Sequence, residues 1–102
     1  MALRLFSRRK VSYDITIFQT PKHGDHKGYR QVYRLEVFGC SHNEVLDRVF
    51  SKFNVPDTVP KDFTARYIST GDILMIDQGK KGKYYYKLFP GGWEQINRIF
   101  VR

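Results

Sequence analysis

Apolar and polar residues alternate along two early segments of the chain. In VSYDITIFQ, residues 11–19, one side carries the apolar and aromatic set Val11, Tyr13, Ile15 and Ile17. In YRQVYRLEVF, residues 29–38, one side carries Tyr29, Gln31, Tyr33, Leu35 and Val37. A period of two residues is typical of a half-buried strand. Because PKHGDHKG at 21–28 is rich in Pro, Gly and charge, the pattern predicts an antiparallel hairpin with a long tip.

A helical pattern follows Gly39. The sequence SHNE at 41–44 is a capping box, in which Ser41 accepts from the N–H of Glu44 and the Glu44 side chain accepts from the N–H of Ser41. The next apolar residues fall on one helical stripe: Val45, Leu46, Val49, Phe50 and Phe53. This spacing predicts a helix over about residues 42–53, with its stripe on the inner face of the hairpin.

The remaining chain returns to strand patterns after an irregular link. Proline lacks an N–H and restricts the preceding residue, so the link after Pro60 is predicted to be non-helical, with its aromatic residues against the sheet edge: Phe63 and Tyr67. DILMID at 72–77 is apolar on both faces, which predicts a central strand. QGKKGK is a predicted turn, and YYYKLF at 84–89 a fourth strand. Residues 93–101 fit either a last strand or a short helix, and the alternation favours the strand.

These elements predict an α+β fold, an antiparallel sheet of four to five strands with one main helix packed on one face. A chain of 102 residues is near the commonest domain size and can bury one core. We therefore expect a basic N-terminal arm at residues 1–10 and a single domain at 11–102.

The net charge of +8 favours an acidic partner, either nucleic acid, an anionic membrane surface or an acidic protein. Basic residues gather in the N-terminal arm, in the hairpin tip and in the later turn, where the candidate protein-binding residues are Lys22, Lys27, Arg30, Lys80, Lys81 and Lys83. Tyr84, Tyr85 and Tyr86 beside the turn also allow a nucleic-acid stacking surface. The competing interpretation is that lysines protect exposed turns while alternate tyrosines face the core.

Catalytic and metal-binding patterns are weak. Cys40 and His42 are two residues apart without a third partner, and no phosphate-binding loop or metalloprotease motif occurs. A metal set of His23, His26, Cys40 and His42 is opposed by distance, since nine strand residues span about 30 Å. We expect no enzyme activity, no cofactor and no metal. With one cysteine, no apolar run long enough for a membrane span and no secretory signal pattern, the expected location is the cytoplasm.

The run PDTVPKDFTARYISTGDILMI, followed by KYYYKLFPGGWEQI, resembles the YodL-like domain family. The features that carry the resemblance are an acidic-proline link, a Ser-x-Gly-Asp start to a strand, a tyrosine-rich strand and a Gly-aromatic turn. The matching residues are Pro60, Asp62, Phe63, Ser69, Gly71, Asp72, Tyr85, Tyr86, Gly92 and Trp93. The motif-bearing part covers residues 53–96, and with the upstream hairpin and helix the chain resembles stand-alone members of the family.

The resemblance implies a small, non-catalytic, cytoplasmic protein of spore-forming bacteria. Its expected activity is to antagonise cell shape and elongation by acting on the actin-like protein MreB. A basic nucleic-acid-binding module is the alternative. We expect the motif residues to hold the fold, because Gly71 allows a tight backbone turn and Asp72 can accept from neighbouring N–H groups.

Overall fold

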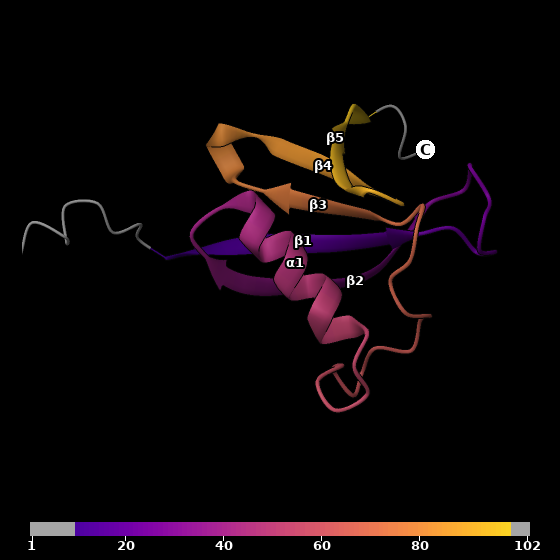
Figure 1. Ribbon diagram of the computed structural model, residues 1–102. Helices are drawn as coiled ribbons and strands as arrows, with labels where there is room; N and C mark the ends of the chain where they lie inside the picture. Colours follow the sequence, from indigo (N-terminus) through magenta and orange to yellow (C-terminus); the bar gives the residue numbers. More distant parts are fainter. Residues whose placement is uncertain (1–9, 99–102) are drawn as a thin grey trace, which may run out of the picture.

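The computed structural model describes residues 10–98 and shows one sheet with one helix across it (Figure 1). The elements in chain order are β1 (Val11–Gln19), β2 (Arg30–Gly39), α1 (His42–Phe53), β3 (Ile73–Asp77), the 3-10 turn η2 (Gly79–Lys81), β4 (Lys83–Phe89) and β5 (Gly92–Ile96). The predicted α+β class is confirmed. Most of the predicted N-terminal arm and residues 99–101 of the predicted last strand lie outside the described residues.

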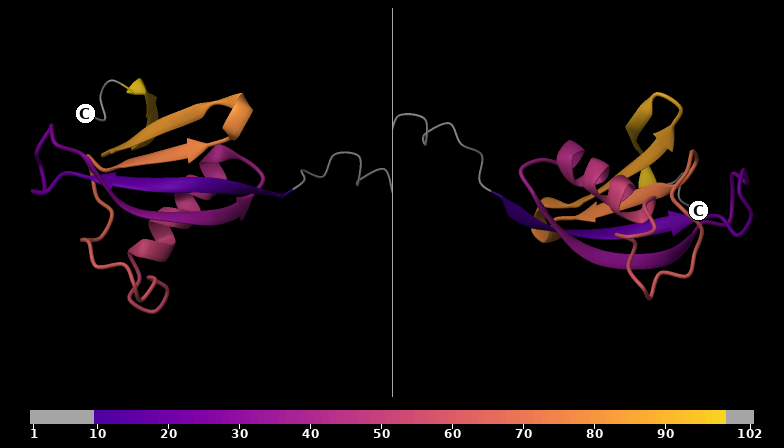
Figure 2. Two further views of the ribbon diagram at one scale, coloured as in Figure 1. Left: turned by 180° about the vertical axis from the view of Figure 1, so that it is seen from behind. Right: turned by 60° about the horizontal axis from the view of Figure 1, so that its bottom comes forward.

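The sheet has five strands in the order β2-β1-β3-β4-β5, and every neighbouring pair is antiparallel. The predicted hairpin of β1 and β2 is confirmed, and so is the central position of β3. The last segment forms strand β5, which agrees with the alternation of its residues. In Figure 2 the helix covers one face of the sheet, and no second helix of residues 10–98 covers the other face. Thr16, Ile73 and Tyr85 on that other face are nevertheless buried.

The register of the hairpin contains one irregularity. Ile17 pairs with Tyr33, whereas the next residue, Phe18, pairs with Gln31. Val32 is therefore an extra residue in β2, as in a β-bulge, and it packs against the core. The prediction that Gln31 lies on the same face as Tyr33 was wrong because the bulge changes the phase of the alternation, and Gln31 is exposed.

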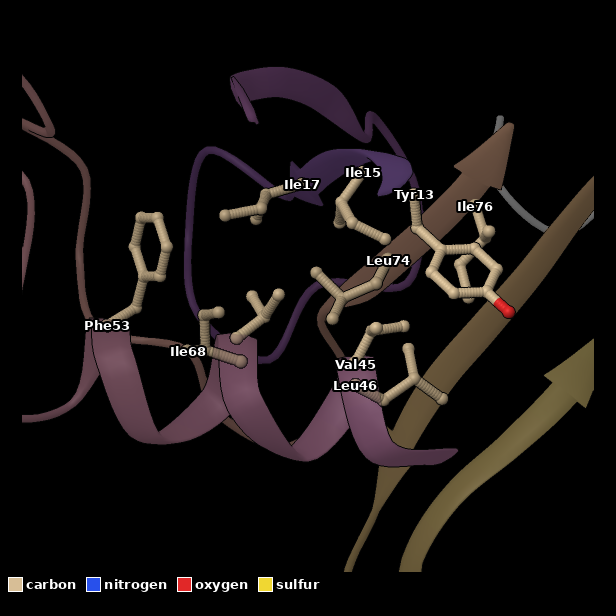
Figure 3. Packing of buried hydrophobic residues seen from close by; sticks show 10 residues of the cluster. Tyr13, Ile15, Ile17, Val45, Leu46, Phe53, Ile68, Leu74 and Ile76 are labelled. Carbon is tan, nitrogen blue, oxygen red and sulfur yellow. The ribbon is translucent and has the colours of Figure 1, made fainter. Parts of the chain in front are cut away.

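The main core lies between α1 and the covered face of the sheet (Figure 3). It is built from alternate residues of the two central strands and from the helix stripe: Tyr13, Ile15, Ile17, Leu74, Ile76, Val45, Leu46, Val49 and Phe53, with Ile68 from the link. The helix sequence predicted this stripe with one error. Phe50 is 37% exposed because its position falls at the margin of the stripe.

The capping box at the start of α1 forms in altered geometry. Ser41 Oγ accepts from the Glu44 N–H at 3.3 Å, as predicted. The Glu44 carboxylate, however, accepts from the N–H of Cys40 at 2.7 Å, one residue earlier than the predicted partner. The chain bends between Gly39 and Ser41, and this bend places the Cys40 amide within reach.

The link is irregular, as predicted, but its two aromatic residues behave differently. The ring of Phe63 packs edge-on against Phe53 and Tyr33, with ring centroids 4.7 and 5.6 Å apart. This contact joins the link to α1 and to the edge strand β2. Tyr67 is 50% exposed, so the prediction that it packs against the sheet was wrong. The chain instead turns inward at the next residue, Ile68, which is buried.

Candidate functional site

A buried polar cluster lies where the link enters β3, and we call it the Asp72 corner. The carboxylate of Asp72 is 1% exposed. Its Oδ2 accepts from Gln19 Nε2 and from the Ser69 N–H, both at 2.9 Å, and its Oδ1 pairs with Arg66 Nη2 at 2.9 Å. These three donors come from β1 and from two points of the link. The corner therefore joins the link to the sheet.

Arg66 connects the Asp72 corner to the base of the hairpin tip. Its Nη1 donates to the carbonyl of Thr20 at 2.6 Å, while its side chain is 30% exposed. Gln19 Nε2 also donates to the carbonyl of Arg66 at 3.0 Å. Arg66 Nε is buried and has no hydrogen-bond partner among the described residues. The guanidinium is therefore held by its Nη atoms, while its Nε–H donates to no other described residue.

Gly71 makes the tight turn into the strand. It has φ +97°, a value that favours glycine, and its N–H donates to the Leu88 carbonyl at 2.7 Å. The carbonyl of Gly71 accepts from the Tyr29 hydroxyl at 2.6 Å. Gly71 therefore forms the tight turn, and Asp72 the hydrogen-bond acceptor, that the sequence predicts at these positions. The tyrosine bond adds a second link between this corner and the hairpin tip.

Burial raises the pKa of Asp72 above its ordinary value of 3.8, although the bonds from Ser69 and Gln19 and the charge of Arg66 act in the opposite direction. The folded chain then holds a proton at pH values where the unfolded chain has already released it. The free energy of unfolding therefore falls as the pH rises from the ordinary value to the raised one.

We expect the substitution Asp72→Asn to remove this part of the pH dependence. Urea unfolding of both proteins between about pH 3 and 7 measures it as the difference between the two stability curves. The lowered pKa of Asp14, caused chiefly by its bond with Arg34, acts with the opposite sign but equally in both proteins. The free energy of unfolding of the wild type minus that of Asp72→Asn should fall as the pH rises. If it stays constant or grows instead, the raised pKa of Asp72 is contradicted.

The other motif residues lie along the link, β4 and β5. Asp62 accepts from the Tyr33 hydroxyl at 2.7 Å, and Trp93 packs against the core from β5. Gly92 begins β5 with φ +128°. Tyr85 is only 9% exposed on the face away from the helix, whereas Tyr86 points to the helix side. Together with Phe63, Ser69, Gly71 and Asp72, these residues make contacts within the fold.

A cluster of tyrosine and glutamine side chains surrounds His42 at the opposite end of the sheet, at the start of α1. His42 Nδ1 lies 2.6 Å from the Tyr86 hydroxyl, and its Nε2 lies 2.9 Å from Gln78 Oε1. The rings of Tyr13 and Tyr84 pack edge-on against the imidazole. Burial raises the pKa of Tyr86. His42 therefore fastens the helix start to β4, a role that the sequence analysis did not predict.

The histidines of the considered metal set lie apart. His23, in the hairpin tip, is 3.4 Å from Ser69 Oγ near the Asp72 corner, whereas His42 contacts β4 and Gln78 at the other end. Within residues 10–98, no group of three or more His, Cys, Asp or Glu residues has the arrangement of a metal site.

The two predicted basic groups also lie at opposite ends of the molecule (Figure 1). Lys22, Lys27 and Arg30 are exposed at the hairpin tip, beside the Asp72 corner. Lys80, Lys81 and Lys83 are exposed around η2, at the end where β1 begins. The structure therefore does not join the six residues into one surface. Each group is a separate candidate for binding.

The YodL-like domain family matches residues 8–97. The chain belongs to this family. It is 56% identical over 102 residues to a Bacillus subtilis (strain 168) protein named "Uncharacterized protein YodL", and the match covers 100% of this chain and 98% of that protein. No solved structure gives a significant match.

Within residues 10–98, no helix has the length and apolar character needed to cross a bilayer.

Proposed function

We propose that this chain is a small non-catalytic regulator of the bacterial cytoplasm that binds and antagonises the actin-like MreB machinery of cell shape and elongation, in connection with sporulation. The observation that carries the proposal is the family match over residues 8–97 together with the full-length similarity to the Bacillus subtilis protein. The resemblance in the motif residues implied this activity. The exposed basic groups supply charge for an acidic protein surface.

The arrangement of the aromatic residues favours a protein partner over nucleic acid. Stacking on bases needs exposed ring faces next to basic side chains. Tyr85 is 9% exposed, and the hydroxyl of Tyr84 is bonded to the Lys81 carbonyl at 2.9 Å while its ring packs on His42. The rings beside the basic turn are therefore used within the fold.

Expression of the chain in growing Bacillus subtilis cells should disturb cell width if the proposal is right. Suppressor mutations should fall in MreB, because a changed binding surface on the target restores elongation. Microscopy of cells at several expression levels measures the effect. An Asp72→Ala variant, expected to be less stable, controls for the burden of expression. Normal cell width at a high level of folded protein would contradict the proposal.

The alternative function, a nucleic-acid-binding module, rests on the basic end of the molecule at η2. Lys83 and Arg98 line one hollow there, and Lys80 and Lys81 are exposed nearby. If these residues contact phosphates, affinity for double-stranded DNA should fall steeply as salt rises. Fluorescence anisotropy at low and moderate salt measures this dependence. Undetectable binding at low salt would remove the alternative.

A further inference from the structure

A hollow between the hairpin tip and the link carries two arginines. Its volume is about 310 Å³, and its lining is Gln19, Thr20, Pro21, Arg30, Val32, Ala65 and Arg66. We call it the arginine hollow. One water occupies about 30 Å³ of liquid, so there is room for a side chain. Among residues 10–98 no carboxylate is part of this lining, whereas the hollow between α1 and β2 is lined by Glu36, Glu44 and Asp47.

The side chains of Arg30 and Arg66 differ in how many contacts they make within the fold. Arg30 is exposed, and within residues 10–98 its side chain makes no hydrogen bond or ion pair. Arg66 is held at its Nη atoms by Thr20 and Asp72, and its Nε is buried without an acceptor. An unsatisfied donor on a cation is costly, and a carboxylate is the acceptor that matches a guanidinium. The Arg66 side chain is 30% exposed and lines the hollow, so its positive charge can attract a bound carboxylate without a change in its present bonds.

Hydrogen bonds hold both walls of the arginine hollow in position. Tyr29, next to Arg30, donates to the Gly71 carbonyl at 2.6 Å, and Thr20 Oγ1 donates to the Lys22 carbonyl at 2.7 Å. The base of the tip is therefore tied to the Asp72 corner, so little order has to be gained when a ligand binds. Lys22 and Lys27 are exposed on the same tip and add positive charge.

We propose that the arginine hollow receives a carboxylate side chain from an acidic segment of a protein partner, with Arg30 and Arg66 as the groups that bind it. The proposal rests on the proposed function as a protein-binding regulator and adds the docking site. It makes the hairpin tip and the Asp72 corner parts of one binding surface. The basic end at η2 takes no part in it.

A titration followed by NMR tests the chemistry of the hollow directly. The ¹⁵N-labelled full chain is titrated with the peptide acetyl-Gly-Glu-Glu-Gly-amide and with the matched neutral peptide acetyl-Gly-Gln-Gln-Gly-amide. The acidic peptide should shift the Nε–H signals of Arg30 and Arg66 and the amides of Thr20 and Ala65, and the neutral peptide should not. Equal shifts around Lys80 and Lys81, or no shifts, would overturn the proposal.

Variants and a phosphate titration complete the test. Arg30→Gln should weaken binding of the acidic peptide about tenfold, because one of the two cations is lost. The control Lys80→Gln has the same change in charge and should leave binding unchanged. Inorganic phosphate that binds the hollow more tightly than the acidic peptide would show a phosphate site instead, and would overturn the assignment to a protein side chain.

Binding to purified Bacillus subtilis MreB separates this proposal from the proposed function. The wild-type chain and Lys80→Glu should bind alike, and Arg30→Glu should bind at least about tenfold more weakly. If MreB fails to bind the wild type while the acidic peptide still shifts Arg30 and Arg66, the function fails and the hollow stands. If MreB binds wild type and Arg30→Glu equally well, the hollow is not the docking site.

Discussion

The substitution Asp72→Ala is expected to lower the free energy of unfolding by about 3 kcal/mol, because it leaves buried donors without an acceptor. Gln19, Ser69 and Arg66 each lose a bond of 2.9 Å. The guanidinium of Arg66 also loses its counter-ion while most of its side chain remains buried. Urea unfolding followed by circular dichroism at neutral pH measures the loss.

Asp77→Ala is the matched control, since Asp77 is the aspartate at the other end of β3. Its Oδ1 accepts a bond from the Gly79 N–H at 2.9 Å, near the surface. Removal of an exposed acceptor lets water satisfy the donor, so we expect a loss within about 1 kcal/mol. Equal losses in the free energy of unfolding would show that the Asp72 corner stabilises the fold no more than an exposed aspartate does. A stable Asp72→Ala protein that fails to bind its partner would instead place the interface at this corner.

Much of the fold could be predicted because the relevant signals are local. The alternation in residues 11–19 and the spacing of Val45, Leu46, Val49 and Phe53 depend on which side chains face the core. A bulge has no such signal. Val32 is an extra residue in β2 only relative to the paired residues of β1. Because of this extra residue, Gln31 lies on the exposed side.

The partners of Asp72 were harder to predict, because they are far apart in the chain. Gln19 offered a signal in retrospect, since it continues the inward series of Ile15 and Ile17 as a polar residue that needs a buried partner. Arg66 offered none. Its role depends on the path of an irregular link, and no periodicity reports that path.

The distribution of charge also needed the topology. β1 leads into the hairpin tip, and the antiparallel strand β3 leads into η2, so the two basic groups must lie at opposite ends. The sequence alone allowed both groups to belong to one surface, because the order and direction of the strands were open. This separation makes Lys80 and Arg30 matched test sites for each other.

The substitution Phe53→Ala is the other change with a large expected effect, a loss of about 3–5 kcal/mol in the free energy of unfolding. Phe53 is 0% exposed and ends α1. Its ring packs edge-on against Tyr33 of β2 and Phe63 of the link, with centroids 5.5 and 4.7 Å away. Truncation removes the aromatic ring shared by the helix, the sheet edge and the link.

Phe50→Ala provides the control within the same helix, because it removes the same atoms from a side chain that is 37% exposed. We expect a loss clearly smaller than that of Phe53→Ala, within about 1.5 kcal/mol, since a partly exposed ring leaves little cavity behind. Thermal and urea unfolding of both variants measure the difference. Limited proteolysis should also cut the link between residues 54 and 71 faster in Phe53→Ala than in Phe50→Ala, because the link loses its contact through Phe63. Equal stability losses would contradict the assignment of Phe53 as the residue that fixes the link to the core.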